Sequence, residues 1–173
     1  MDLNTKQEIL EVLTMPEETF WSQVAPAARE VCQKQFGTSL LVTAMLAYTN
    51  ICKNQCLYCG MRAGNKIPRY RMSPEEILPL AQRAREDGLG RMFLLAGEDQ
   101  NYGFEKLLTL IAGLRQQGYT IALGAGELSR TQYQELHDAG VEEYVLKFEM
   151  SHPDSFQRLN PSTTYAKRMG CAQ

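Results

Sequence analysis

The spacing of apolar residues divides the chain into a helical N-terminal stretch and a longer stretch in which strand-like and helix-like segments alternate. In the first stretch, helical spacing predicts helices over 5–13 and, with an interruption near Pro26, over 17–36. Five apolar residues mark one face of the second helix: Trp21, Val24, Ala28, Val31 and Cys32. We therefore expect Cys32 to be a buried, small apolar residue, and 1–37 to be an N-terminal helical segment.

From residue 38 the pattern changes to short apolar runs separated by capped, amphipathic segments. The apolar runs predict four buried strands, over 40–48, 91–96, 120–123 and 143–148. Capping boxes that begin at Ser73 and Ser129 and an amphipathic run from Phe104 predict the helices between the strands, and a short helix is expected over 153–159. This alternation predicts an α/β fold with parallel strands and right-handed crossovers.

Composition narrows the classes of partner. The formal net charge of −2 and a pI near 5.8 give no electrostatic basis for binding nucleic acid or an anionic membrane. No apolar run approaches the length that spans a bilayer, and the N-terminus lacks the basic and apolar regions of a signal peptide. Five cysteines without a secretory signal argue against a disulfide framework. We therefore expect a cytoplasmic protein with neither nucleic acid nor membrane as a partner.

Polar residues and glycines follow all four expected strands. The cysteine-containing stretch follows the first, Gly97 and Glu98 follow the second, and Glu127 follows the third. Lys147 and Glu149 lie at the end of the fourth. Any one of these carboxylates alone is most simply a helix N-terminal charge or a solvated loop residue. Because the carboxyl ends of parallel strands face one common site, the groups together predict a functional site there.

Three closely spaced cysteines, Cys52, Cys56 and Cys59, can hold one compact soft-metal centre but leave it one ligand short. The other two cysteines and both histidines lie far away in sequence. An iron–sulfur cluster with three cysteine ligands keeps one iron open to a small molecule, so the missing ligand suggests a reactive centre and not a purely structural one. A structural zinc knuckle, or a disulfide plus a spare thiol, is the alternative.

The spacing Cys-x3-Cys-x2-Cys, with an aromatic residue before the last cysteine, resembles the signature of radical S-adenosylmethionine (SAM) enzymes. Within that superfamily the chain is similar to the group containing biotin synthase, methylornithine synthase and the radical SAM maturase of FeFe-hydrogenase, and most similar to the maturase. Five segments carry the resemblance: 48–62, 69–77, 96–99, 123–127 and 144–151.

The resemblance implies a cofactor role for eight residues. Three of them would bind the closed irons of a 4Fe–4S cluster: Cys52, Cys56 and Cys59. Tyr58 would offer backbone groups to the adenine of SAM. Gly97 and Glu98 would bind its amino group, since a carboxylate accepts hydrogen bonds from an ammonium and glycine permits close approach. Glu149 would bind the ribose hydroxyls, and the planar guanidinium of Arg168 would pair with the SAM carboxylate.

Further residues match the family less closely. Glu127 and Lys147 are candidate catalytic residues on the substrate side of the cavity, although the family often has arginine at the Lys147 position. Ala96 stands where the family's motif has its first glycine. Arg69 and Arg71 are expected to have surface or loop-anchoring roles.

The resemblance also implies a function. It indicates an enzyme that uses a 4Fe–4S cluster and SAM to make a 5′-deoxyadenosyl radical, in assembly of the di-iron centre of FeFe-hydrogenase. The implied partners are a small-molecule or iron-synthon substrate, a ferredoxin or flavodoxin as electron donor, and other hydrogenase maturation proteins. The alternatives are a methylornithine synthase-like or biotin synthase-like enzyme, and a non-catalytic cluster-binding fragment.

Chain length sets one further expectation. A closed (β/α)8 barrel typically needs about 250 residues, whereas only four strands are predicted here. We therefore expect 38–173 to form the first half of a TIM-type barrel, apparently truncated, with unpaired edges on its first and fourth strands. Such a chain is expected to bind cluster and SAM, to self-associate, and not to turn over substrate alone.

Overall fold

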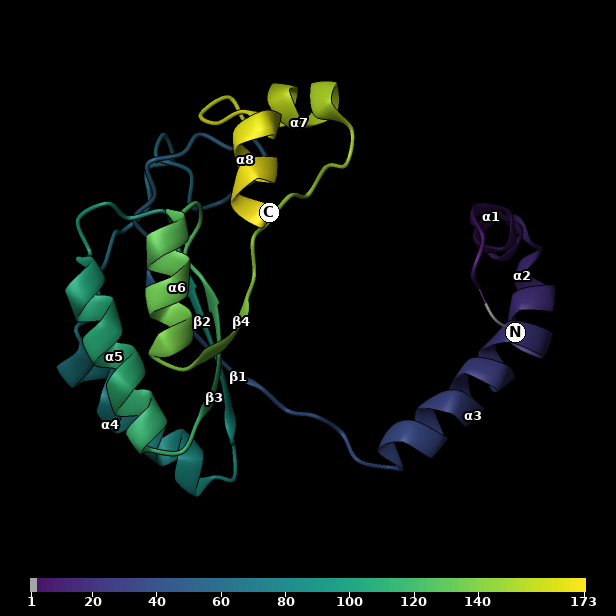
Figure 1. Ribbon diagram of the computed structural model, residues 1–173, viewed down its shortest axis with the longest axis horizontal. Helices are drawn as coiled ribbons and strands as arrows, with labels where there is room; N and C mark the ends of the chain where they lie inside the picture. The colour runs from purple at the N-terminus through teal and green to yellow at the C-terminus, as the bar shows by residue number, and fades with distance from the viewer. Residues whose placement is uncertain (1–2) are drawn as a thin grey trace. The chain divides into compact units, whose positions relative to one another are not determined.

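The computed structural model describes residues 3–173 and divides into two compact units, the first ending at Leu41 and the second running from Val42 to Gln173 (Figure 1). The described part of the first unit forms only helices and turns, whereas the second unit carries all the strands of the described chain. Over 3–173, no helix is both long and apolar enough to cross a bilayer.

The N-terminal unit consists of α1 (Lys6–Thr14) and a second helical run formed by α2 (Glu17–Thr19), a π-helical turn η1 (Phe20–Val24) and α3 (Ala25–Phe36). The π-helical turn is the interruption expected near Pro26. Proline has no N–H to donate and its ring crowds the preceding turn, so the helix widens just before it. The Ala25 N–H accordingly bonds to the Phe20 carbonyl, five residues back.

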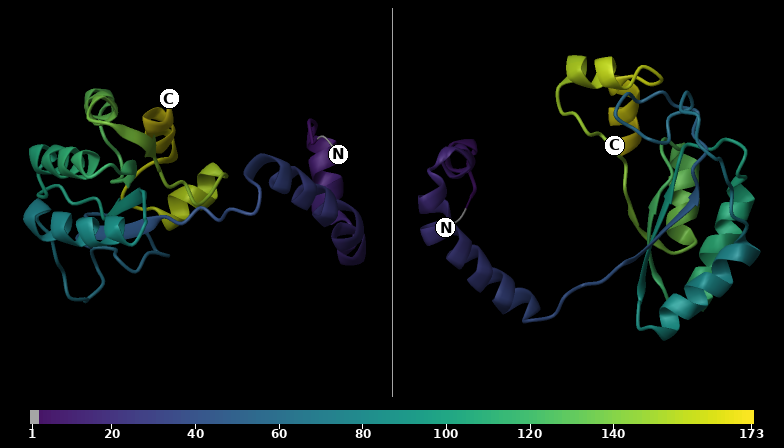
Figure 2. Two further views of the ribbon diagram at one scale, coloured as in Figure 1. Left: turned by 90° about the horizontal axis from the view of Figure 1, so that it is seen from below. Right: turned by 180° about the vertical axis from the view of Figure 1, so that it is seen from behind.

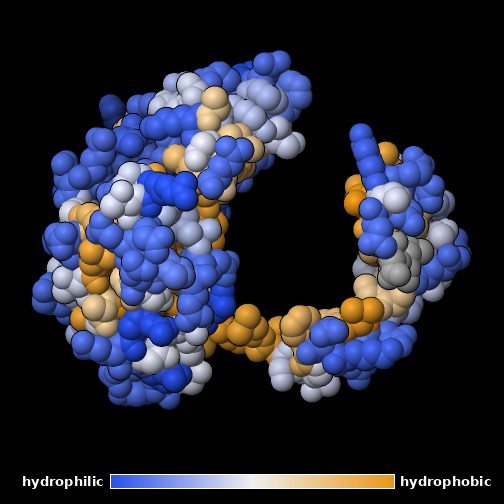
Figure 3. All heavy atoms as spheres, in the orientation of Figure 1, coloured by the Kyte–Doolittle hydropathy of each residue, from blue (hydrophilic) through white to orange (hydrophobic). Residues whose placement is uncertain are grey.

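The apolar face of the second helical run is not buried within this unit, so the expectation that Cys32 is buried is wrong. Cys32 is exposed, as are Trp21 and Val31, and no residue of α1 or α3 is buried. Figure 3 shows further apolar surface on the stretch that joins the two units, where Leu40 is 86% exposed. Helical spacing identified an apolar face, but the few residues of this unit offer too little surface to cover it.

The second unit is built on one parallel sheet in the order β1–β2–β3–β4 (Figure 1). Its strands are β1 (Ala44–Thr49), β2 (Arg91–Ala96), β3 (Thr120–Gly124) and β4 (Val141–Tyr144). The predicted α/β fold with parallel strands is confirmed, and the bounds of β2 agree with the prediction.

Two strand predictions need correction. The first strand was expected from residue 40, but β1 begins at Ala44, which pairs with Met92 near the start of β2, so the preceding residues have no strand to bond to. The fourth strand was expected over 143–148, but β4 spans Val141–Tyr144 because its pairing with β3 ends at Tyr144. Apolar runs reveal residues that prefer burial, whereas pairing decides where a strand begins and ends.

Helices connect the strands in the expected rhythm. The helices are α4 (Pro74–Glu86), α5 (Phe104–Gln116) and α6 (Arg130–Asp138), followed after β4 by α7 (Pro153–Leu159) and α8 (Tyr165–Ala172). Capping boxes are present at Ser73 with Glu76 and at Ser129 with Gln132, as predicted. They satisfy free backbone N–H groups in the first turn and so fix where α4 and α6 begin.

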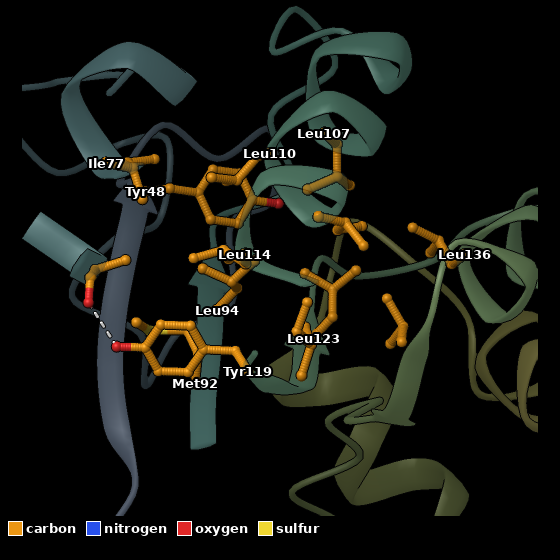
Figure 4. Close-up of a cluster of buried hydrophobic side chains, with 14 of the residues drawn as sticks. Tyr48, Ile77, Met92, Leu94, Leu107, Leu110, Leu114, Tyr119, Leu123 and Leu136 are labelled. Atoms are coloured by element: carbon orange, nitrogen blue, oxygen red, sulfur yellow. Dashed lines mark hydrogen bonds between the residues drawn. The ribbon is translucent and has the colours of Figure 1, made fainter. Parts of the chain in front are cut away.

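The core lies between the sheet and α4, α5 and α6, which run along one side of it in two views (Figures 1 and 2). Met92 and Leu94 of β2 face this core, where they meet Leu110 and Leu114 of α5 (Figure 4). Tyr119, which is fully buried, donates a 2.6 Å hydrogen bond from its hydroxyl to the Ala81 carbonyl of α4. This bond ties the start of β3 to α4.

The opposite side of the sheet, which we call the open face, carries the alternate side chains Met45, Phe93 and Leu95. Met45 and Phe93 are register partners on β1 and β2. Met45 is exposed, and Phe93 and Leu95 are only half-buried. The sheet therefore buries one face with its own helices and leaves the other partly accessible.

Replacing Tyr119 by phenylalanine should destabilise the second unit by about 1–2 kcal/mol, because a buried hydrogen bond is lost with little change in packing. Tyr70→Phe is the matched control, since the exposed Tyr70 hydroxyl donates a similar bond to the Ala47 carbonyl. Urea unfolding would measure both. Equal losses in the two variants would contradict the role assigned to burial.

Candidate active site at the carboxyl ends of the strands

A cavity of about 410 Å³ lies at the carboxyl ends of the strands, and its lining comes from the segments that follow each of them. It brings together most of the site residues predicted from the sequence: Cys52, Cys56, Tyr58, Cys59, Gly97, Glu98, Lys147, Glu149 and Arg168. Apolar groups of Leu95, Gly124 and Val145 contribute the sheet side of the lining. Glu127 lines a neighbouring cavity of about 290 Å³ instead.

The three cysteines lie on the segment 50–70, which we call the cysteine loop. It leaves the sheet after Thr49 and returns at Arg71, which forms a β-bridge with Thr49. A backbone hydrogen bond from Cys59 to the Cys56 carbonyl turns the chain between these two thiols. Burial raises the pKa of the Cys56 thiol, and the proximity of Cys52 and Cys59 raises it further. The three sulfurs thus share one partly desolvated region.

Hydrogen bonds join the cysteine loop to the turn between α7 and α8. Tyr58 donates a 2.6 Å hydrogen bond from its hydroxyl to Asn160, which is itself buried. The backbone N–H groups of Gln55 and Leu57 donate to Ser162 and to the carbonyl of Leu159. Sequence reasoning missed Asn160 and Ser162. The only signal was a short polar stretch after a predicted helix, which is more often a solvated turn.

Tyr58 remains a hydrogen-bond donor over the physiological pH range. Burial, and then the neighbouring Cys56 and Glu149, raise its pKa to about 12. The hydroxyl is therefore protonated and can keep its bond to Asn160. This contact leaves the Tyr58 backbone at the cavity wall, between two cysteines.

Gly97 allows β2 to approach the cysteine loop closely. A Cβ atom at Gly97 would lie 2.2 Å from the Ile51 carbonyl oxygen and 2.8 Å from Cys52 Cβ, so a larger residue would push the loop away. The Glu98 N–H points to Cys52 Sγ at 3.4 Å, and the Lys53 N–H donates to the Glu98 carbonyl at 3.1 Å. Cys52 is thus fixed against the end of β2.

The Glu98 carboxylate lies between two cations. Its Oε2 is 3.2 Å from Lys53 Nζ and its Oε1 is 3.5 Å from Arg168 Nη2. Only a tenth of the Glu98 side chain is accessible. Gly126, with φ +83°, passes so close that a Cβ there would lie 1.9 Å from Glu98 Cγ. Close backbone approach and two cations therefore orient the carboxylate at the cavity wall.

Arg168 is a buried guanidinium that joins three segments of the site. It donates to Glu127 Oε1 at 2.9 Å, to the Lys147 carbonyl, and to Glu98. Its side chain is almost fully buried, so its charge depends on these partners. The segments after β2, β3 and β4 are thereby connected through one side chain of α8.

Glu127 is already fully engaged. Its Oε1 also accepts a 2.6 Å bond from Thr163, and its Oε2 lies 2.9 Å from Lys167 Nζ. Burial on its own would raise the pKa of Glu127, but hydrogen bonds from Lys167, Thr163 and Arg168 outweigh burial and lower the pKa to about 2. The carboxylate is therefore ionised and turned toward α8.

Lys147 and Glu149 lie in the irregular segment that follows β4, not on the strand itself, and both line the 410 Å³ cavity. Glu149 has φ 59°, the one positive φ among the non-glycine residues described here. Such a backbone is costly for glutamate and occurs most often where function requires it.

The donor set fits both groups that the sequence suggests. Three cysteines and no histidine line the described cavity, and a three-thiolate set suits an iron–sulfur cluster with one open iron. Within 3–173, no cluster of three or more His, Cys, Asp or Glu side chains is arranged around a single metal ion. Two carboxylates and one guanidinium in the same cavity complement an amino acid with ribose hydroxyls, and the volume suits a ligand of that size.

Comparisons with known proteins identify the family. Residues 46–173 match the radical SAM superfamily. The chain is 31% identical over 168 residues, 96% of its length, to the [FeFe] hydrogenase maturase subunit HydE of Thermotoga maritima, of which it covers 48%. It is 25% identical to the 2-iminoacetate synthase of Escherichia coli, covering 89% of this chain and 41% of that protein. It is 24% identical to the 3-methylornithine synthase of Methanosarcina acetivorans, covering 91% of this chain and 46% of that protein.

Solved structures share the fold. The crystal structure of methylornithine synthase (PylB) superposes with a TM-score of 0.87 at 22% identity, over 97% of this chain and 51% of that one. The structure of HydG, a maturase of the [FeFe]-hydrogenase, gives 0.84 at 22% identity, over 97% and 41%. The chain thus spans about half the length of the relatives it matches, with the fold of a partial TIM-type barrel. The cysteine spacing, the parallel sheet and the family match agree, and the chain belongs to the radical SAM superfamily.

Proposed function

We propose that this chain binds a 4Fe–4S cluster through Cys52, Cys56 and Cys59 and binds SAM beside it. The observation that carries the proposal is the single cavity lined by these cysteines, two carboxylates and the Arg168 guanidinium. When bound, a reduced cluster supplies the electron that cleaves SAM to methionine and a 5′-deoxyadenosyl radical. Radical SAM proteins generally use both cofactors, which supports assigning them to this site.

Five residues of the cavity have separate tasks toward SAM. Glu98 accepts hydrogen bonds from its ammonium, and Gly97 lets the backbone approach. Arg168 pairs with its carboxylate, and Glu149 accepts from the ribose hydroxyls. The backbone of Tyr58 meets the adenine, because the Tyr58 hydroxyl is tied back to Asn160. These contacts fix the orientation of SAM through charge and hydrogen bonding.

Glu127 acts through Arg168 and not on substrate. Its carboxylate is saturated by Thr163, Lys167 and Arg168, so it is a positioning residue that holds the guanidinium in place. Lys147 lines the cavity and offers an ammonium to an anionic group of the substrate. Of the two candidate catalytic residues, Lys147 is the one that can meet a substrate.

Similarity to the relatives supports a proposal for the substrate class. We infer a maturase-type reaction in assembly of the FeFe-hydrogenase di-iron centre, supported by 31% identity to a protein named as an [FeFe] hydrogenase maturase. A small molecule or iron synthon is the substrate, a ferredoxin or flavodoxin gives the electron, and other maturation proteins are partners. A lysine-rearranging enzyme of the methylornithine synthase type is the second candidate, supported by the similarity to 3-methylornithine synthase.

The residues that we propose to bind the cofactors lie in one part of the chain. We assign the cofactor site to the domain 38–173, and 1–37 to a separate N-terminal helical segment. The assignment is supported by the residues that line the cavity, which lie between Cys52 and Arg168. In this proposal the N-terminal segment contributes no cofactor ligand.

Anaerobic reconstitution should give an oxygen-labile 4Fe–4S cluster whose electron paramagnetic resonance spectrum changes when SAM is added, because one iron has no protein ligand. Cys52→Ala, Cys56→Ala and Cys59→Ala should each abolish the cluster. Cys32→Ala and Cys171→Ala are the controls and should retain it. Stoichiometric zinc without iron after anaerobic purification would show that the site is a structural metal centre instead.

Glu98→Gln should weaken SAM binding by about 1.5–3 kcal/mol, roughly 10- to 150-fold in Kd, since a charge-assisted hydrogen bond becomes a neutral one. Glu149→Ala should weaken it as well, and both variants should keep the cluster. Calorimetry on reconstituted protein measures this, with Glu105→Gln on the exposed face of α5 as control. Unchanged affinity in both site variants would mean that SAM binds elsewhere.

Glu127→Gln should reduce both SAM affinity and stability at neutral pH. The folded-state pKa of about 2 lies below the ordinary value of 4.5, so Glu127 stabilises the fold above pH 4.5 and loses that contribution as pH falls toward 2. The full contribution is on the order of 3 kcal/mol. Urea unfolding between pH 3 and 7 should show a flatter pH dependence for Glu127→Gln than for the exposed control Glu135→Gln. Parallel profiles would contradict the buried ion cluster.

A further inference from the structure

Arg69 makes an unusual set of contacts inside the cysteine loop. Its Nη1 donates to the carbonyl oxygens of Asn50 at 2.6 Å and Met61 at 2.8 Å. Its Nη2 donates to those of Arg62 at 2.7 Å and Asn65 at 2.9 Å. One guanidinium therefore joins the first residue of the loop to three residues that follow its last cysteine.

Hydrogen bonds next to Arg69 also join the two ends of the cysteine loop. The Asn50 side chain donates to the Pro68 carbonyl and accepts from the Tyr70 N–H, both at 2.8 Å. The Asn50 N–H also reaches the Tyr70 carbonyl. Asn50 and Tyr70 thus hold the two ends of the loop together, and Arg69 occupies the space just inside this closure.

Arg69 has no carboxylate partner among the described ion pairs, so carbonyl dipoles alone neutralise its charge. Asn50 and Met61 have no other described donor for their carbonyls, whereas Arg62 and Asn65 also accept one backbone N–H each. A planar fork of N–H donors can satisfy several carbonyls at fixed angles, whereas a lysine ammonium cannot span the same set. The contacts therefore depend on arginine specifically.

We propose that Arg69 is a positioning residue that shapes the cysteine loop for its cluster before the cluster arrives. The inference rests on the proposed function, because it takes the three cysteines as the cluster ligands. The cysteine loop has 21 residues, and without ordering contacts it would lose conformational entropy when its three thiolates bind one cluster. The backbone contacts of Arg69 order the loop beforehand, so less entropy is lost when the cluster binds. Loading should then be fast and the loaded cluster slow to leave.

The first test needs no cofactor. Amide hydrogen exchange of the full, cluster-free chain should be at least ~10-fold faster at Ala63, Gly64 and Asn65 in Arg69→Ala than in the wild type, because several charge-assisted bonds are lost. Exchange at β2 and β3 should not change. Lys66→Ala is the matched control, since it removes the same charge from the same loop at an exposed residue with no described side-chain hydrogen bond.

The second test uses the cluster. After anaerobic reconstitution, Arg69→Ala should hold several-fold less iron and sulfide per chain and should release iron to a chelator at least ~10-fold faster than wild type or Lys66→Ala. Arg69→Lys keeps the charge and should resemble Arg69→Ala. If Arg69→Ala fails to fold, as judged by exchange of β2 and β3, Arg69→Lys decides the question.

The outcomes separate the two proposals. The role of Arg69 would be overturned if Arg69→Ala showed the loop exchange and the iron retention of the wild type. Where the alanine variant does not fold, the same result in Arg69→Lys would overturn it. Full rescue by Arg69→Lys would also overturn it, because charge alone would then suffice. Failure of the wild type itself to take up iron would overturn the proposed function, and the exchange result would still decide whether Arg69 orders the loop.

Discussion

The site depends on the buried guanidinium of Arg168. It contacts Glu98 after β2, Glu127 after β3 and the Lys147 carbonyl after β4, so three separate crossovers are connected through one side chain. A buried cation is unfavourable unless its partners are correctly placed, and the same partners are costly if the cation is removed. Lys167, which also pairs with Glu127, adds a positive charge beside two buried carboxylates. The cavity wall is therefore an interdependent cluster of charges and not a set of independent side chains.

Parallel strand order explains why these residues meet at all. Because all four strands are parallel, each crossover returns the chain to the same edge of the sheet, and residues that follow β1, β2, β3 and β4 converge although up to about a hundred residues separate them. Contacts between distant segments then set the distances within the site. Gly97 allows Cys52 to lie against the end of β2, and Tyr58 and Asn160 join the cysteine loop to the turn before α8. Topology brings the groups together, and these few contacts fix their geometry.

Much of the second unit could be predicted from the sequence because its signals are local. Capping boxes and apolar runs depend on neighbouring residues, and the starts of α4 and α6 and the bounds of β2 follow from them. The starts of β1 and β4 could not be predicted as well, since they depend on strand pairing across the sheet. The exposure of Cys32 depends on which other segments pack against its helix, and helical spacing carries no information about them. In the site, the cysteine spacing predicted three residues that line the cavity, whereas Asn160 carries no local signal and is identified only by its contact with Tyr58.

In the proposed function, cofactor binding and substrate choice use different residues. The groups proposed to bind cluster and SAM all line one cavity, and the two proposed positioning residues contact them from outside it: Arg69 within the cysteine loop, and Glu127 at Arg168. Lys147 is the cavity residue that we propose for contact with the substrate. Relatives with different names match most of the chain in sequence, and the structure of methylornithine synthase shares its fold over 97% of the chain. The open face of the sheet carries the apolar side chains Met45, Phe93 and Leu95, of which Met45 is exposed near the start of β1. In the proposed function, selectivity among substrates therefore lies with the cavity residues around Lys147, and not with the groups proposed to hold the cofactors.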